Sequence, residues 1–189
     1  MIPSSLLEPL EEVISCLIHN HEFARAVHFI KTNSLHIHSK TFLLLLLHCQ
    51  VQLKDWSNAE QTLIDYEDGL VGKADLTNLT ESEDPQKARI AHLKGVVFNA
   101  LEKRELAIDE FKFSVKSDSS AVSSMMTIAN RKMMAEKEAQ VFIEEIFPGQ
   151  DEEEMRSVYE MHLTPSEFDL KKHSRECKLL NPASIGSLY

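Results

Sequence analysis

The apolar residues of this chain recur at intervals of three and four, the spacing at which side chains share one face of an α-helix. Over 4–32 two such faces follow each other, the first with Leu10 and Leu17 and the second with Ala26. The polar segment His19-Asn20-His21 separates them. The pattern therefore predicts two short helices joined by a tight turn.

The same order of helix, turn and helix is predicted three more times along the chain. The four expected helix pairs are 4–32, 39–66, 85–117 and 120–147. Two glycines and several Ser, Thr and Asp residues predict a loop over 67–84. Additional helices are expected over 151–163 and 164–180. We therefore expect an all-α chain with a single helical-repeat domain over 1–189.

Alanines in the second helices place these pairs in register. Ala26 and Ala59 are 33 residues apart, and Ala107 follows Ala59 by 48 residues, an excess that the loop at 67–84 can absorb. A tetratricopeptide repeat is a helix pair of about 34 residues, and one pair cannot bury its own apolar face. The spacing predicts a tetratricopeptide-like array, an α-solenoid; the alternative is a plain helical bundle whose alanines align by chance.

The pair over 85–117 has the best-formed pattern, because small and aromatic residues alternate along it. Small residues let two helices approach closely where they cross, so Gly95 is expected to lie against the helix that carries Ala107. The predicted repeat-packing residues are Ala26, Ala59, Gly95, Phe98, Ala107, Phe111 and Ser114. The helix with five consecutive leucines, Leu43–Leu47, is apolar on all sides and is expected to be buried between neighbours.

Charge and composition narrow the classes of function. The formal net charge is −10, which argues against nucleic acid as the main partner. Phe42–Leu47 is the longest apolar run, far short of the ~20 residues of a membrane-spanning helix. Three widely spaced cysteines are typical of a reducing compartment. We expect a nuclear or cytoplasmic protein, or one found in both, without a membrane partner.

Candidate chemistry is sparse. The pairs His19/His21 and His36/His38 could offer imidazoles to a metal, but no cysteine or carboxylate cluster accompanies them to complete four ligands. The chain has no glycine-rich phosphate loop and no nucleophile elbow. We therefore expect no cofactor, no metal and no enzymatic activity.

Four stretches carry a resemblance to a known family. They are Phe23–Phe29, Leu43–Leu63, Leu93–Val115 and Met133–Phe147. Over about 5–163 the chain resembles the tetratricopeptide scaffold subunits of the anaphase-promoting complex, a ubiquitin ligase, and looks most like the N-terminal region of subunit six, the cell-division-cycle sixteen type. The resemblance implies a non-catalytic protein–protein interaction scaffold that acts in mitosis and cell-cycle control. It also implies binding to other protein subunits and homodimerisation.

If the chain dimerises as that family does, its first helices would form the interface. The candidate interface residues are Leu10, Leu17, Leu43, Leu46 and Leu47. The alternative is a tetratricopeptide adaptor or subunit of another assembly, such as a vesicle coat or a chaperone co-factor. A chaperone adaptor would need basic residues on its concave helices to bind two carboxylates, and Lys94 and Arg131 are the candidates.

Overall fold

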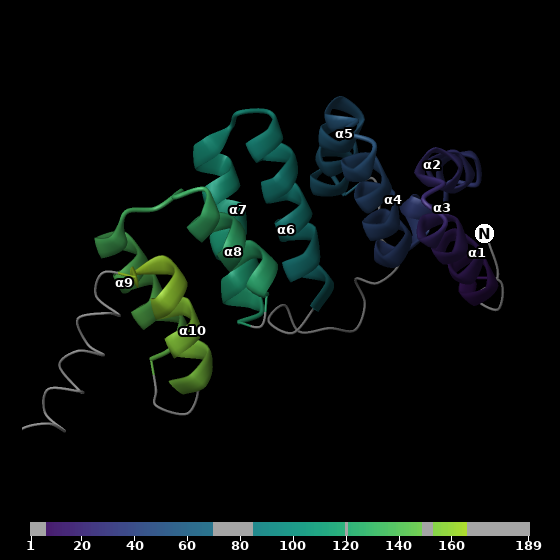
Figure 1. Cartoon of the computed structure of the whole chain (residues 1–189). Coiled ribbons are helices and arrows are strands. Elements are labelled where there is room, and N and C mark those ends of the chain that lie inside the picture. Colours follow the sequence, from purple (N-terminus) through teal and green to yellow (C-terminus); the bar gives the residue numbers. More distant parts are fainter. Residues whose placement is uncertain (1–6, 70–84, 120, 149–152, 166–189) are drawn as a thin grey trace, which may run out of the picture. The chain divides into compact units, whose positions relative to one another are not determined.

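Helices alternate with short turns along the described chain (Figure 1). The computed structural model describes residues 7–69, 85–119, 121–148 and 153–165, and every regular element in these ranges is a helix. The predicted loop over 67–84 and the predicted helix over 164–180 lie almost entirely outside the described residues. The elements are α1 (Leu7–His19), α2 (Phe23–Thr32), α3 (Leu35–His38), α4 (Lys40–Gln52), α5 (Trp56–Glu67), α6 (Pro85–Ala100), α7 (Arg104–Ser117), α8 (Val122–Asn130), α9 (Glu136–Ile146) and α10 (Glu153–Leu163).

One element, α3, was not expected from the sequence. It is a single helical turn, too short to show an apolar period, and it is anchored by the fully buried side chain of Leu35. Ser39 separates it from α4 and caps that helix, because the Ser39 hydroxyl accepts a hydrogen bond from the backbone N–H of Thr41 at 3.2 Å.

The turns inside the four helix pairs share one backbone conformation. Each contains a non-glycine residue in the left-handed region, with φ between 47° and 61°: His21, Lys54, Glu102 and Lys132. The N–H of the following residue then donates to a carbonyl five positions earlier, as from Asp55 to Gln50 at 2.9 Å and from Lys103 to Phe98 at 2.9 Å. This is the Schellman arrangement, which satisfies the last carbonyls of the first helix.

The repeat alanines follow these turns at a constant distance in three of the four pairs. Ala26, Ala59 and Ala107 each lie five residues after the left-handed residue, and each is fully buried. Their backbone N–H groups bond to the carbonyl of the residue that precedes the second helix, at 3.0–3.1 Å. Ala139 lies seven residues after Lys132, so the fourth pair departs from this register.

The chain divides into two compact units, Met1–Ser124 and Met125–Tyr189. The first contains α1 to α7 and the start of α8, and the second contains the remainder. One helical-repeat domain over 1–189 therefore stays a prediction.

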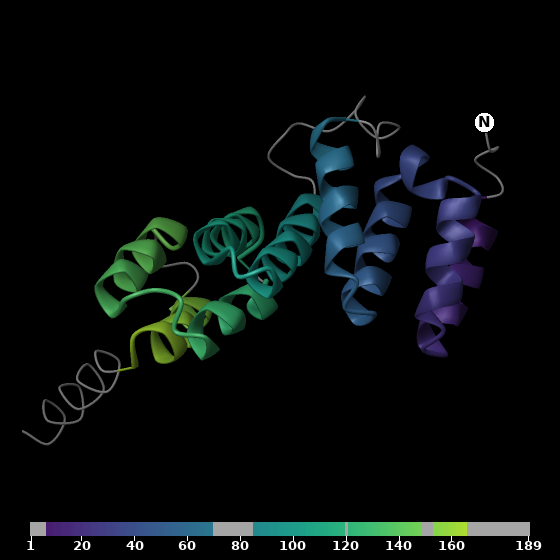
Figure 2. The ribbon, with the colours of Figure 1, turned by 90° about the horizontal axis from the view of Figure 1, so that it is seen from above.

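The first unit has two apolar clusters, and α4 contributes to both. Phe42, Leu46 and Cys49 face the cluster formed with α1, α2 and α3. Leu43 and Leu47 face the cluster formed with α5 and α6. Figure 2 shows α4 beside α5 in this unit, and the two helices are in contact. Leu43, Leu46 and Leu47 are thus buried between neighbours, whereas Leu44 and Leu45 are only half-buried.

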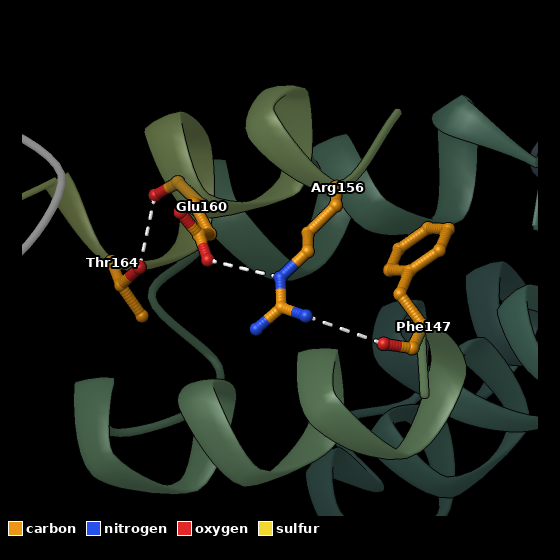
Figure 3. A network of polar contacts seen from close by, with 4 residues as sticks. All are labelled: Phe147, Arg156, Glu160 and Thr164. Carbon is orange, nitrogen blue, oxygen red and sulfur yellow. Dashed lines mark hydrogen bonds and ion pairs between the residues drawn. The ribbon is translucent and has the colours of Figure 1, made fainter. Parts of the chain in front are cut away.

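In the second unit, α9 and α10 enclose a smaller core. The rings of Phe147 and Tyr159 pack edge to face, with their centroids 5.2 Å apart. Arg156 links the two helices: its Nε donates to Glu160 Oε1 at 3.2 Å and its Nη1 to the carbonyl of Phe147 at 3.4 Å (Figure 3). Thr164 Oγ1 donates to the carbonyl of Glu160 at 3.0 Å, which satisfies an acceptor at the end of α10.

Candidate protein-binding groove

A groove of about 490 Å³ opens in the first unit, lined mainly by the first helices of successive pairs. Its volume lies within the ~300–1,000 Å³ range of sites that hold a ligand. We call this surface the groove. Its lining residues come from α4 (Leu44, Leu45 and His48), from α6 (Ala88, Arg89, His92 and Leu93), from the end of α7 and the residue after it (Ser114 and Asp118), and from the start of α8 and the residue before it (Ala121, Ser123 and Ser124).

The groove follows the register of the repeat. Leu44 and His92 line it, and each stands 15 residues before a repeat alanine, Ala59 and Ala107 respectively. Leu45 and Leu93 come one position later in α4 and α6. Equivalent positions of the two first helices α4 and α6 therefore contribute to one surface.

A chain of hydrogen bonds lies beneath the groove. Ser114 Oγ bonds to the backbone carbonyl of Ala88 at 2.8 Å, and Ser124 Oγ bonds to Ser114 Oγ at 2.9 Å. His92 Nδ1 lies 2.8 Å from Ser124 Oγ. The chain joins α6, α7 and α8, and both serines are buried. Ser114, predicted as a small packing residue, is thus also a hydrogen-bonding residue.

Burial makes the imidazoles of the groove neutral at pH 7. Desolvation lowers the pKa of His92 and of His48 below the ordinary value of 6.5. Arg89 is exposed, and Leu44, Leu45 and Leu93 are half-buried. The groove thus combines half-buried apolar residues with neutral imidazoles, the exposed Arg89 and the half-buried Asp118, a mixture suited to a peptide rather than to a phosphate backbone.

Within the described ranges, the titratable residues do not assemble a metal site. No group of three or more His, Cys, Asp or Glu side chains there converges on a point that could hold a metal ion. Burial raises the pKa of the Cys49 thiol to about 11, so it stays protonated and unreactive at neutral pH. Among the same residues, none of the helices combines the length and apolarity needed to cross a bilayer. The lack of enzymatic activity stays a prediction.

The repeat-packing residues of the best-formed pair come together between α6 and α7. A Cβ added to Gly95 would stand 2.7 Å from Cε1 of Phe111, so the glycine is in direct contact with that ring. Ala107, Phe111 and Ser114 are fully buried.

Phe98 lies differently from these neighbours. It is only half-buried, and the ammonium groups of Lys94 and Lys103 lie 5.5 Å and 5.9 Å from its ring centroid. Val97 is the fully buried residue at this point of α6. The ring of Phe98 therefore serves as a cation–π surface rather than as core packing.

Three of the five candidate interface residues are wrong for that role. Leu43, Leu46 and Leu47 have no exposed surface, because they fill the chain's own two clusters on either side of α4. A partner could reach them only if the core opened. Leu10 and Leu17 are half-buried against the first cluster, and their part in an interface stays a prediction.

Lys94 does not line the groove. It lies in a smaller pocket of about 210 Å³ between α5, α6 and α7, where its Nζ pairs with Glu67 and Glu110 at 2.5 Å each. Burial alone would lower the pKa of Lys94, but the hydrogen bonds to the two carboxylates outweigh it and raise that pKa. Lys94 is therefore already neutralised and does not serve a carboxylate clamp in the groove.

Apart from Ser114, sequence reasoning missed the groove residues, although a signal for two of them was present. Once the alanines are aligned, Leu44 and His92 occupy the same repeat position. That position holds an apolar residue in α4 and a polar residue in α6, so an apolar period does not mark it. An alignment of repeats, rather than a search for motifs, would have found it.

Comparison with known proteins gives a structural relative. No protein-family model matches the chain, and no curated protein matches its sequence. Among solved structures, a chain from the crystal structure of the APC/C hetero-tetramer Cut9-Hcn1 matches with a TM-score of 0.67 and 17% sequence identity. The match covers 94% of this chain and 34% of the other, so this chain spans about a third of the length of its relative. The predicted fold class is confirmed: the chain is an all-α, tetratricopeptide-like α-solenoid.

Proposed function

We propose that this chain is a non-catalytic protein–protein interaction scaffold that holds a partner segment in the groove. The observation that carries the proposal is the register of the groove, because equivalent positions of the first helices α4 and α6 line it. Repeat solenoids use such extended surfaces to bind other proteins. A surface built from repeated positions can follow a segment of polypeptide from one helix pair to the next.

We further propose that the assembly is of the anaphase-promoting-complex type, in the nucleus, the cytoplasm or both. The support is the resemblance of the four sequence stretches, together with a structural relative that comes from an APC/C hetero-tetramer. Other protein subunits are then the partners. A second copy of the chain is also proposed as a partner, through the surface near Leu10 and Leu17.

Affinity purification of the tagged chain from cells tests the scaffold. We expect stoichiometric co-purification of other proteins, and identification of anaphase-promoting-complex subunits among them would support the finer proposal. Subunits of a vesicle coat or chaperones would support the alternative, and a chain recovered without stoichiometric partners would contradict scaffolding. Leu44→Gln in the groove should reduce recovery by about threefold or more, because it removes apolar contact area.

Leu53→Gln is the matched control. Leu53 is 43% exposed at the end of α4 and does not line the groove, so this variant should retain the partners. Circular dichroism of both variants would establish that they remain folded. Light scattering at micromolar concentration tests self-association separately, and a strict monomer would contradict the homodimer.

A further inference from the structure

The hydrogen bonds beneath the groove can run in only one direction. A carbonyl has no hydrogen to give, so Ser114 donates its single hydroxyl hydrogen to the carbonyl of Ala88. Ser114 therefore accepts from Ser124, which uses the single hydrogen of that hydroxyl. Ser124 can then only accept from His92, and the Nδ1 atom of His92 must carry a hydrogen.

This direction determines what His92 offers to a ligand. In the neutral ring, a hydrogen on Nδ1 leaves Nε2 with a free lone pair. Nε2 has no hydrogen-bond partner among the residues that the structure describes, and His92 lines the groove. The ring thus presents a hydrogen-bond acceptor to whatever occupies the groove. Protonation would change Nε2 alone and would leave the bonds beneath it intact.

Arg89 provides the complementary charge. It stands three positions before His92 on α6 and lines the same groove, with no hydrogen bond or ion pair to any described residue. Asp118 also lines the groove but already has a partner in the chain, and burial lowers the pKa of His48. Arg89 is therefore the charged side chain of the groove that has no partner among the described residues, although the whole chain is acidic.

We propose, building on the proposed scaffold function, that the groove binds an acidic linear segment of another protein. A carboxylate of this segment pairs with Arg89, and one of its N–H or O–H groups donates to Nε2 of His92. An apolar side chain of the segment packs on Leu44 and Leu45. His92 selects for a donor at this point, because an acceptor there would face the lone pair and be repelled.

Two substitutions separate this role from a structural one. In His92→Asn the side-chain amide can still donate to Ser124 from near the position of Nδ1, but no atom replaces Nε2. Arg89→Gln removes the charge at an exposed position. Arg25→Gln on α2 is the matched control, because Arg25 is exposed, does not line the groove and pairs only with Glu22 among the contacts described.

A displayed library of random short linear peptides, selected on the full-length chain, provides the probe. We expect the selected peptides to contain an acidic residue next to an apolar one. Their affinity should fall about threefold to tenfold for His92→Asn, and about tenfold for Arg89→Gln. Arg25→Gln should bind as the unmodified chain does. Equal binding to all variants, selected peptides without acidic residues, or no selected peptide would overturn the proposal.

Two further results would also overturn it. Nitrogen NMR of the His92 ring should show the hydrogen on Nδ1, and the opposite tautomer would remove the acceptor. If His92→Asn and Arg89→Gln abolish self-association in light scattering, then a second copy occupies the groove instead. Stoichiometric partners that co-purify equally with both variants would leave the scaffold function intact while this inference failed.

Discussion

The contact between Gly95 and Phe111 decides how closely α6 and α7 approach. The ring of Phe111 is fully buried, so it has little room to move away from a larger residue at position 95. Glycine is otherwise unfavourable inside a helix, by about 1 kcal/mol relative to alanine. Its presence in the middle of α6 is explained by this close approach.

Gly95→Ala is therefore expected to destabilise the chain despite its better helix propensity. Overpacking costs about 1–3 kcal/mol, and the higher helix propensity of alanine offsets about 1 kcal/mol of this cost. The free energy of unfolding, measured in urea, should therefore fall by up to about 2 kcal/mol. In a Phe111→Leu background the added methyl group has space, and the same substitution should become neutral or stabilising. A stabilising Gly95→Ala in the unmodified chain would contradict the close contact.

Three partly buried histidines make the stability depend on pH. Burial is the largest cause that lowers the pKa of His36, His48 and His92 below 6.5. The unfolded chain therefore binds more protons than the folded chain just below that pH, and the free energy of unfolding rises with pH there. The contribution is fully present above 6.5 and is lost as pH falls through the folded pKa values.

We expect the melting temperature to fall as the pH is lowered from about 7.5 to about 5.5. A double variant, His48→Gln with His92→Asn, should flatten this dependence. Thermal unfolding followed by circular dichroism measures the slope. A melting temperature that rises as the pH falls over this range would contradict the assignment.

At the scale of elements, the turn within each helix pair recurs more strictly than any side chain of the repeat. His21, Lys54, Glu102 and Lys132 all adopt the left-handed conformation, although none is a glycine. A side chain in this conformation costs roughly 1–2 kcal/mol, which the paired hydrogen bonds of the Schellman turn offset. The turn geometry thus holds even where the sequence is unfavourable.

Lys54→Gly should consequently stabilise the chain by about 0.5–1 kcal/mol, because relief of strain exceeds the added entropy of the unfolded chain. Gln61→Gly in the middle of α5 is the control, and it should destabilise by about 1 kcal/mol. Urea unfolding of both variants measures the two effects. If Lys54→Gly and Gln61→Gly lower stability equally, then the turn is not strained.

At the scale of the molecule, the two compact units are each expected to unfold cooperatively. Stability in a solenoid is a sum of local terms, so separate units need not unfold together. The single tryptophan, Trp56, lies in the first unit and reports its unfolding by fluorescence, whereas circular dichroism reports helices of both. We expect the two signals to give different urea midpoints.

A destabilising substitution in the second unit distinguishes independent unfolding of the two units from unfolding as one. Phe142→Ala removes a buried side chain from α9, and the loss is expected to be about 3–5 kcal/mol. It should shift the circular dichroism transition and leave the Trp56 midpoint unchanged. Coincident transitions that shift together would show that the chain unfolds as one cooperative unit.

Local features of the fold could be predicted because they depend on neighbours in the sequence. The four helix pairs and the start of α6 at Pro85 follow from apolar period and capping residues. The single helical turn α3 was not predicted, because a segment of four residues is too short to show the spacing of apolar residues that marks a helix. Of the candidate site, only Ser114 was named in advance, as a packing residue, because the groove is formed by residues from four separate regions of the chain.

The sequence by itself determined the helical class, the repeat register and the small residue at the crossing of α6 and α7, since these depend on spacing along the chain. Only the tertiary structure decided which faces stay open. Leu43, Leu46 and Leu47 became core rather than interface, and Leu44, Leu45 and His92 came to line the groove. The physical reason is that exposure depends on which helices pack on each side. The hydrogen of His92, likewise, is placed by serines 22 and 32 residues further along the chain.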